Sequence, residues 1–372
     1  MKFPECTLRR LILSAVLLAV SGISCSSGSA DTPLLHVSGN NLVNASGNQV
    51  ILHGVDYAGP EYQCTSGRGI FAGPTDQASV TAMKEWGINV VRLPLNEACW
   101  NGARYVKPQY AGTKYRAAIR SYVDLLNSNG IAVILDMHWS AGLYTGVSHL
   151  CSSAEALCQK PMPDAAGAVP FWSSVATTFK GDSEVIFDLF NEPFPDKAIP
   201  TEEAAWTCWL NGGSACSPGI AYQTAGMQTL VNTVRAAGAG NVLMIGGLGF
   251  ANDLTEWLRY EPHDPDDNLV ASWHSYNFNP CDNRSCWESK VSPVTAAVPV
   301  IAGEVGSNNC STSYIDAVAS YLDSVSTGYL AWSWNAHVKC GLISNWSGIP
   351  TAEGAGYKSH LRSVAKMGAS QL

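Results

Sequence analysis

Short apolar runs recur along the chain at spacings that leave room for a helix between consecutive runs. The runs are almost continuously apolar, which is typical of strands buried on both faces of a sheet. Alternation of such strands with helices predicts βα units and a parallel sheet. We expect eight strands, at residues 50–55, 89–93, 132–137, 185–190, 242–245, 269–273, 300–302 and 329–332.

Amphipathic stretches lie between the expected strands. In residues 115–127, Ile119, Tyr122 and Leu126 fall on one helical face, and residues 313–326 show the same periodicity. Eight such units close into a barrel, so the predicted fold is α/β, a (β/α)8 TIM barrel. A doubly wound sheet is the alternative, but it would need fewer strands and usually a glycine-rich phosphate turn, for which we find no match.

The N-terminal region divides into an export signal and a small hairpin. Residues 1–30 combine Lys2, Arg9 and Arg10 with an apolar run and a small-residue exit, which is typical of a secretory signal peptide. The apolar run is about half the length that a membrane-spanning helix needs. Residues 34–49 are expected to form a hairpin that plugs the barrel floor, with its turn at residues 46–48. Residues 31–372 then form a single catalytic domain.

Composition restricts the partners of the protein. The formal net charge is -8 and only 14% of residues are charged, which does not suit binding to phosphate backbones or to anionic lipid. We therefore expect no contact with nucleic acid or, once the signal is removed, with a membrane. The export signal predicts a secreted, extracellular protein, which we expect to be a monomer.

Cysteine spacing predicts a disulfide framework. Two of the twelve cysteines leave with the signal, and the remaining ten can form five pairs in an exported protein. Short spacings favour Cys151 with Cys158, Cys208 with Cys216, and Cys281 with Cys286; Cys64 with Cys99 and Cys310 with Cys340 follow by elimination. Zinc is the rival interpretation, but no Cys-x-x-Cys lies near a histidine pair, so no metal or other cofactor is expected.

Polar residues end most of the apolar runs. A TIM barrel builds its active site at the carboxyl ends of its strands, so these residues are the candidates for chemistry. They are Arg92 after the second strand, residues 136–139 after the third, 191–193 after the fourth, 274–276 after the sixth, 303–304 after the seventh and 332–334 after the eighth.

Two of these residues, Glu192 and Glu304, are carboxylates on different strands. When two carboxylates converge in one cavity, each raises the proton affinity of the other until one holds a proton near neutral pH. The pair then provides an acid and a nucleophile. Cleavage of a glycoside with retention of configuration requires such a pair, with carboxyl groups about 5 to 5.5 Å apart.

The order of these motifs resembles glycoside hydrolase family 5, the cellulase-type retaining barrel glycosidases, over nearly all of the mature chain. The motifs are Asn-Glu-Pro after strand four, the glutamate ending strand seven, the arginine after strand two and His-x-Tyr after strand six. The resemblance implies that Glu192 is the acid/base and Glu304 the nucleophile.

The same resemblance implies roles for the neighbouring residues. Arg92 and Tyr276 would hydrogen-bond the nucleophile and keep it ionised, and Asn191 would hold the sugar 2-hydroxyl. His138 and His274 would orient the substrate and the acid/base. Trp332 would form the apolar platform under the sugar, with Trp334, two residues further, as an open alternative.

Several of these residues also have structural interpretations. Arg92 could merely neutralise Asp136 in the barrel floor, the histidines could be structural, and Trp332 could be a core residue. Asp136 is expected to point away from His138 in a regular strand and is left out of the site. Three further tryptophans are assigned to the core because they lie at helical positions: Trp86, Trp172 and Trp257.

The long loops after strands one, three, four and six bear on the mode of action. They carry cysteines, and four tryptophans lie in or beside them, in positions from which they are predicted to be able to stack on sugar faces: Trp100, Trp206, Trp209 and Trp287. An endo-β-1,4-glucanase acting on polysaccharide is the family default. An exo-acting, disaccharide-releasing or furanoside-cleaving enzyme is the alternative, since pinned loops would wall the site.

Two other classes of protein stay open from the sequence. One is a carbohydrate-binding barrel that has lost catalysis, although it retains both glutamates. The other is a metal-dependent barrel hydrolase, which would need His-x-His after the first strand, where this chain has Val55-Asp56-Tyr57.

Overall fold

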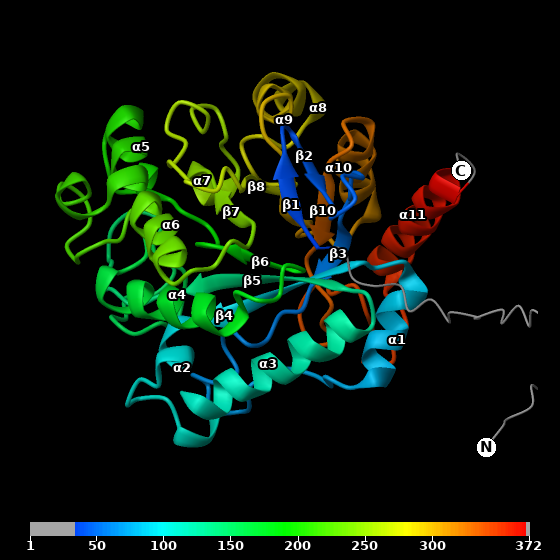
Figure 1. The fold of residues 1–372 in the computed structure, drawn as a ribbon, viewed down its shortest axis with the longest axis horizontal. Helices are drawn as coiled ribbons and strands as arrows, with labels where there is room; N and C mark the ends of the chain where they lie inside the picture. The colour runs from blue at the N-terminus through cyan, green and yellow to red at the C-terminus, as the bar shows by residue number, and fades with distance from the viewer. Residues whose placement is uncertain (1–33, 370–372) are drawn as a thin grey trace, which may run out of the picture.

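A computed structural model describes residues 34–369, so the predicted signal peptide lies outside the described residues. Eight parallel strands form a closed barrel in the order β10-β3-β4-β5-β6-β7-β8-β9. The prediction of a (β/α)8 barrel is therefore confirmed. In Figure 1 the helices follow the chain around the barrel, from cyan α1 and α3 through green α4 and α6 to orange α10 and red α11.

Each of the eight predicted strands corresponds to one strand of the barrel. The observed bounds are β3 His53–Asp56, β4 Val90–Asn96, β5 Ala132–Trp139, β6 Val185–Asp188, β7 Leu243–Gly246, β8 Leu269–Tyr276, β9 Val300–Gly306 and β10 Gly328–Ala331. Four of them, β4, β5, β8 and β9, run two to four residues beyond the predicted ends, which extends paired backbone into the region that holds the polar residues.

Helices connect most of the strands, and the two predicted from periodicity correspond to α3 and α10. The bounds are α1 Gln77–Trp86, α2 Glu97–Asn101, α3 Thr113–Ser128, α4 Ala165–Phe179, α5 Glu202–Asn211, α6 Met227–Ala236, α7 Leu248–Ala251, α8 Arg284–Cys286, α9 Ser292–Thr295, α10 Thr312–Ser324 and α11 Ala352–Ala369. Among the described residues, the crossover from β7 to β8 contains only the four-residue α7.

Side chains alternate between the two faces of the barrel wall. Outward residues such as Val91 and Leu135 join the core beneath the helices. Inward residues such as Val90 and Ile134 form a separate apolar layer inside the lower barrel. Because strand side chains repeat every second residue, the next inward positions on β4 and β5 are Arg92 and Asp136. The barrel interior therefore has an apolar lower layer and a charged upper layer.

An antiparallel hairpin of β1 (His36–Ser38) and β2 (Asn41–Val43) closes the lower end of the barrel. Leu35 and Leu42 belong to the inner apolar layer. The hairpin lies next to α9 (Figure 1), where the Asn40 side chain donates a hydrogen bond to the Thr295 carbonyl. The predicted plug is confirmed.

The turn of the hairpin was misplaced. Gly39, with φ of 59°, sits in the two-residue turn that joins β1 to β2. The predicted turn at residues 46–48 also forms, but it follows β2 and closes a bridge between Val43 and Gln49. Two turns of similar composition lie close together here, and the alternation of apolar residues did not distinguish them.

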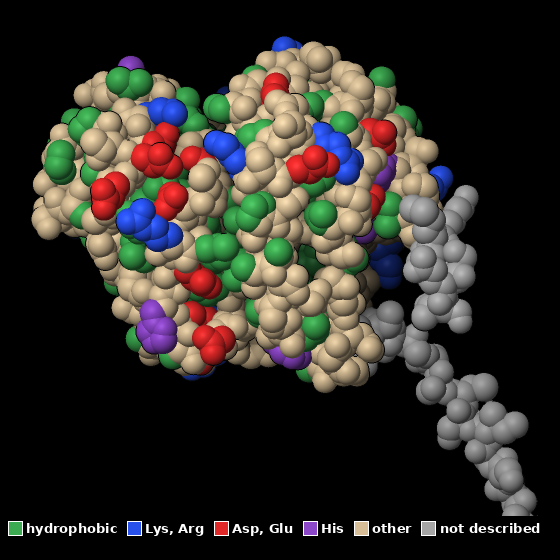
Figure 2. Space-filling view, turned by 90° about the horizontal axis from the view of Figure 1, so that it is seen from above, with side chains coloured by type: hydrophobic (Ala, Val, Ile, Leu, Met, Phe, Trp, Pro, Cys, Tyr) green, Lys and Arg blue, Asp and Glu red, His purple; other side chains and the backbone are tan. Residues whose placement is uncertain are grey.

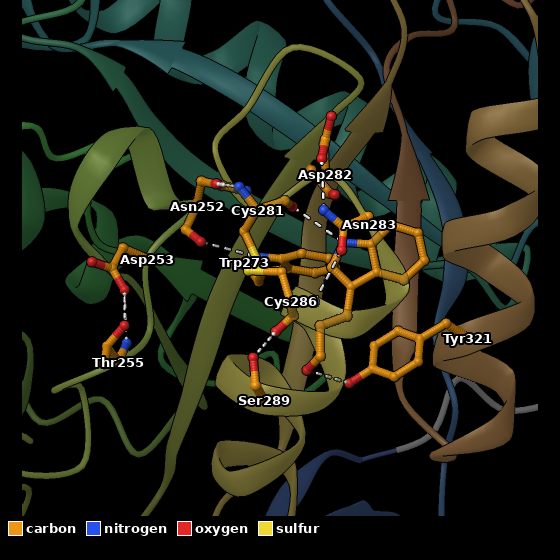
Figure 3. The surroundings of a disulfide bond; sticks show 12 residues. Asn252, Asp253, Thr255, Trp273, Cys281, Asp282, Asn283, Cys286, Ser289 and Tyr321 are labelled. Atoms are coloured by element: carbon orange, nitrogen blue, oxygen red, sulfur yellow. Dashed lines mark hydrogen bonds between the residues drawn. A yellow bond between two sulfur atoms is a disulfide. The ribbon is translucent and has the colours of Figure 1, made fainter.

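Five disulfides tie the loops that follow the strands, with the pairing predicted from spacing for three of them and by elimination for the other two. Two of them link neighbouring loops, Cys64–Cys99 and Cys310–Cys340, and the other three close short loops. Figure 3 shows one of the short loops, in which the Cys281 amide donates to Asn252 Oδ1 and Trp273 Nε1 donates to the Asn252 carbonyl. The bridges therefore fix the loops at the mouth of the barrel.

The surface carries few charges, and both signs are interspersed on the face that Figure 2 shows. Over the residues that the structure describes, no helix has the length and apolar character needed to cross a bilayer.

Candidate active site

Glu192 and Glu304 face each other at the mouth of the barrel. Glu192 lies just beyond the end of β6, and Glu304 lies within β9. Three atoms lie within 4.8 Å of one another: one carboxylate oxygen of Glu192, one of Glu304 and a ring nitrogen of His274. The Glu192 side chain is 20% exposed and that of Glu304 only 4%. The sequence-predicted pair is thus brought together, with Glu192 the more accessible member.

A break in the register of β8 and β9 aligns His274 with Glu304. Trp273 pairs with Ala302, and the next residue, His274, pairs with Glu304, so that Gly303 is left over as a bulge. A Cβ at Gly303 would lie 2.9 Å from His274 Nε2. Glycine is therefore required before Glu304, because a side chain there would collide with the imidazole. Bulges of this kind re-aim side chains beside active sites.

Glu304 accepts a hydrogen bond at each carboxylate oxygen. Arg92 Nη1 donates to Oε1 at 3.0 Å, and the Tyr276 hydroxyl donates to Oε2 at 2.6 Å. Burial and the neighbouring Glu304 raise the pKa of Tyr276 well above its usual value, so the phenol keeps the proton that it donates. The two donors stabilise negative charge on Glu304.

Arg92 is fully buried and contacts four carboxylates. Besides Glu304, its guanidinium lies 3.0 Å from Asp56, 3.1 Å from Asp136 and 2.9 Å from Asp188. One positive charge cannot balance four negative charges in a buried site. Accordingly, burial raises the pKa of Asp136 to about 7 and the pKa values of Asp56 and Asp188 well above their usual range, despite the opposing effect of Arg92. Arg92 thus contacts both Asp136 and Glu304.

Glu192 contacts a histidine, whereas Glu304 contacts an arginine and a tyrosine. Glu192 Oε1 lies 3.1 Å from His274 Nδ1. Burial raises the pKa of Glu192 to about 7, against the opposing effect of the Arg92 charge. Both histidines are neutral at pH 7, since burial lowers the pKa of His138 to about 4 and that of His274 to about 3. Near neutral pH a large fraction of Glu192 is therefore protonated.

Asn191 is held by an ordered set of hydrogen bonds. Arg92 Nη2 donates to Asn191 Oδ1 at 2.7 Å, and since a guanidinium can only donate, the orientation of the amide is fixed. Asn191 Nδ2 then faces His138 Nε2 at 3.4 Å. His138 Nε2 must accept, so the proton of the neutral ring lies on Nδ1, 2.6 Å from Asp136 Oδ2.

This arrangement corrects the expectation for Asp136. Residues two apart on a strand face the same side, so Asp136 and His138 both point into the barrel and contact each other. The earlier expectation that they would point apart was wrong, and Asp136 belongs to the site.

The two candidate platform tryptophans have different surroundings. Trp332 is partly exposed and stacks on His138, with ring centroids 5.5 Å apart and planes within 13°. Trp334 is fully buried and packs edge-on against Trp86 at 4.9 Å. The chain turns after β10 through a cis peptide between Trp332 and Ser333. Only Trp332 therefore offers a face near the site.

The tryptophans expected to line the loops do not do so. Trp100, Trp206 and Trp209 are fully buried and Trp287 is 3% exposed. All four belong to the core beneath the loops, so the prediction that they stack on sugars was wrong. Large apolar rings are buried wherever the core beneath a loop has room for them. The position of these tryptophans in loops of the sequence did not show that such room exists. The three tryptophans assigned to the core are buried as predicted.

Sequence reasoning also missed several polar residues around the site. Asp56 and Asp188 reach Arg92 from β3 and β6. Gln159, on the loop after β5, accepts from Asn191 Nδ2 and donates to the Glu192 carbonyl. For the aspartates, counting every second residue up from the apolar layer would have found them. For Gln159 the sequence carries no comparable signal.

A cavity of about 350 Å³ lies on the same face, between the loops that follow β6, β7 and β8. Phe250 and Phe278 contribute its aromatic surface, and Asp196, Lys197 and Lys290 its charges. The ring of Phe278 stacks on Tyr276 at 5.2 Å, so the cavity adjoins the site.

Two groups of side chains among the described residues have the spacing of metal ligands. One is Glu192, His274 and Glu304; the other is Cys310, Cys340 and Glu353. The two cysteines of the second group form a disulfide and cannot serve as thiolate ligands. The first group coincides with the carboxylate pair, and a chelator distinguishes a metal role from direct acid/base chemistry.

The family of the chain follows from its sequence and agrees with this geometry. Residues 43–338 match the model of the cellulase family, glycosyl hydrolase family 5. The chain belongs to this family and is a glycosidase, an enzyme that hydrolyses O-glycosyl bonds.

Curated relatives fall into two groups by name. A mannan endo-1,4-beta-mannosidase of Streptomyces lividans is 23% identical over 333 residues, covering 87% of this chain and 71% of the relative. An endoglucanase of Paenibacillus polymyxa is 23% identical over 325 residues, covering 81% and 79%.

Solved structures share the fold. A β-glucanase from Saccharophagus degradans has a TM-score of 0.67 at 18% identity and covers 90% of this chain and 94% of its own. A mannanase from a Streptomyces species has a TM-score of 0.61 at 19% identity, with 92% of each chain covered.

Proposed function

We propose that the protein is a secreted retaining glycosidase that cleaves β-linked glycosides by double displacement, with Glu304 as nucleophile and Glu192 as acid/base. The observation that carries the proposal is the approach of the two carboxylates to within 4.8 Å, which leaves no room for a water between sugar and base as inversion requires. Their different surroundings support the assignment, since Glu304 accepts two hydrogen bonds and Glu192 has a raised pKa.

In the first step a carboxylate oxygen of Glu304 attacks the anomeric carbon while the bond from that carbon to the leaving oxygen breaks. Glu192 donates its proton to the leaving oxygen. A covalent glycosyl-enzyme and an ionised Glu192 result.

In the second step Glu192 removes a proton from water as the water oxygen attacks the anomeric carbon. The bond to Glu304 breaks, and both glutamates return to their starting states. Asn191 holds the sugar 2-hydroxyl in both steps, and Trp332 supports the apolar face of the ring.

Product stereochemistry tests the mechanism. Proton NMR recorded during the first minutes of hydrolysis should show the β-anomer as the initial product from a β-linked substrate. Initial release of the α-anomer would exclude the covalent intermediate.

The proposed substrate is a β-1,4-linked polysaccharide cut within the chain, with glucan as the first choice. The cavity that adjoins Tyr276 supports endo action because it offers room for further sugar units beside the carboxylate pair. Mannan is the second candidate, because relatives with both names match over most of the chain.

Viscosity measurements on a soluble cellulose derivative and on a soluble mannan test this choice. An endo-acting glucanase lowers the viscosity of the cellulose derivative early, before much reducing sugar appears. Release of small sugars at nearly constant viscosity would indicate exo action, and preference for mannan would reassign the sugar. Added chelator should leave turnover unchanged. Loss of turnover in the presence of chelator would support a metal role.

Export is proposed from the five disulfides together with the predicted signal. N-terminal sequencing of protein recovered from the medium should find a start close to Asp31. Accumulation inside the cell with residues 1–30 intact would contradict it.

The pH profile should report Glu192. Because this carboxyl must be protonated to act as acid and its pKa is about 7, kcat/KM should fall as pH rises through about 7. Glu192→Gln should remove that limb when the leaving group is a good one that needs no proton. Persistence of the limb in the variant would assign it to another group.

Substitution separates the two tryptophans at the end of β10. Trp332→Ala should lower kcat/KM about 10-fold, the loss expected of one stacking contact, with little change in thermal stability. The buried Trp334 is the matched control: Trp334→Ala should lower the free energy of unfolding by about 3–5 kcal/mol. Kinetics and denaturant titration of both variants would show the reverse pattern if Trp334 were the platform.

A further inference from the structure

The loop between β5 and α4 places an uncharged side chain, Gln159, between Asn191 and Glu192. Gln159 is only 3% exposed. Its Oε1 accepts from Asn191 Nδ2 at 3.2 Å, and its Nε2 donates to the Glu192 carbonyl at 3.2 Å. One amide therefore joins the side chain of Asn191 to the backbone of Glu192.

The direction of these hydrogen bonds is fixed from the barrel interior. Arg92 can only donate, so it holds Asn191 Oδ1 and turns Nδ2 toward Gln159. Gln159 must then present its oxygen to Asn191, which leaves its nitrogen for the Glu192 carbonyl. Each donor in this series of hydrogen bonds therefore meets an acceptor. Reversal of the Gln159 amide would place its nitrogen against Asn191 Nδ2, a second donor, and its oxygen against the Glu192 carbonyl, a second acceptor.

The loop that carries Gln159 is held on both sides of it. The Cys151–Cys158 disulfide ends at the residue directly before Gln159. The residue after it, Lys160, is 1% exposed and donates from Nζ to the Ser153 carbonyl at 2.6 Å. The loop itself is mostly irregular and partly exposed, so without these ties it would not hold a side chain accurately.

We propose that Gln159 is a positioning residue, which orients the Asn191 amide toward the sugar 2-hydroxyl, and that the Cys151–Cys158 disulfide maintains this geometry. The role rests on the proposed function, because Asn191 is its link to the substrate. In the free site both Nδ2 hydrogens of Asn191 are engaged, by His138 and by Gln159. The 2-hydroxyl can replace the 3.4 Å contact with His138 while Gln159 keeps the amide from rotating.

The test compares an aryl β-glycoside with its 2-deoxy counterpart. Gln159→Met keeps the length of the side chain and removes both hydrogen bonds. We expect it to lower kcat/KM about 10- to 100-fold on the parent glycoside, the range typical of groups that hold a functional side chain in place. On the 2-deoxy glycoside the loss should be less than about 3-fold, because the contact that Asn191 would make is already missing.

A second variant separates positioning from packing. Gln159→Glu keeps an acceptor for Asn191 but, when ionised, faces the Glu192 carbonyl with an oxygen. Protonated, it can donate as glutamine does. Its activity relative to the native enzyme should therefore fall as pH rises, whereas the loss in Gln159→Met should be the same at each pH.

The disulfide has a matched control on the same face. Cys151→Ser/Cys158→Ser should reproduce the parent-selective loss of Gln159→Met. Cys281→Ser/Cys286→Ser, which opens another short loop (Figure 3), should leave the ratio between the two substrates unchanged.

The results of these comparisons decide for or against the positioning role of Gln159. Equal losses on both substrates, or a loss in Gln159→Glu that is independent of pH, would overturn the positioning role and leave retaining hydrolysis intact. Failure of the native enzyme to cleave any glycoside would instead remove the proposed function and this role with it.

Discussion

Glu304→Ala should lower turnover by a factor on the order of 10⁴ or more. In the proposed mechanism the variant loses the atom that attacks the anomeric carbon, and the remaining groups cannot replace it. Arg92 keeps three carboxylate partners, Asp56, Asp136 and Asp188, so the interior should stay folded. Steady-state hydrolysis of an activated aryl β-glycoside measures the loss.

Azide serves as the internal control for this variant. It can occupy the space of the deleted carboxylate and attack the sugar directly, so turnover should recover and yield an α-glycosyl azide. Recovery also demonstrates that the variant is folded. Formation of the β-glycosyl azide would mean that the nucleophile is still present and that Glu304 has another role.

Glu192→Ala should discriminate between leaving groups. Loss of a general acid lowers the rate about 10²- to 10⁴-fold. The step that slows is departure of the leaving oxygen. Substrates with poor leaving groups should therefore slow by that amount, and substrates with good ones far less. A series of aryl glycosides of graded acidity measures the slope of log kcat/KM against leaving-group pKa, which should steepen in the variant.

Glu203, on the surface of α5 with a side chain 79% exposed, is the matched control. Glu203→Ala should leave both the rates and the slope unchanged. Equal slowing of good and poor substrates by Glu192→Ala would contradict its role as acid.

The barrel could be predicted because its strands are buried on both sides. Apolar runs such as residues 132–137 are long enough to be recognised without an alternating pattern, and glycine and polar residues mark their ends. The ends were less predictable. β8 continues to Tyr276 because backbone pairing with β9 extends past the apolar run, and pairing between segments distant in sequence leaves no local trace.

The site could be predicted only where residues carry recognisable chemistry at strand ends. Glu192, Glu304 and their neighbours follow apolar runs directly. Asp188 lies inside such a run, where it reads as an exception to the pattern, and Gln159 lies in a loop whose path depends on a disulfide. The prediction for the loop tryptophans was wrong for the opposite reason. Their residue type suggested sugar binding, but only packing determines whether a ring faces solvent.

The hairpin that seals the barrel floor also determines how the enzyme can be attached to a surface. Leu35 donates its amide hydrogen to the Ser183 carbonyl, just before β6 begins and at the opposite end of the barrel from Glu192. A linker joined ahead of Leu34 would therefore leave from the underside. Enzyme immobilised through that linker would present its mouth to the bulk solution, where long polymers have free access.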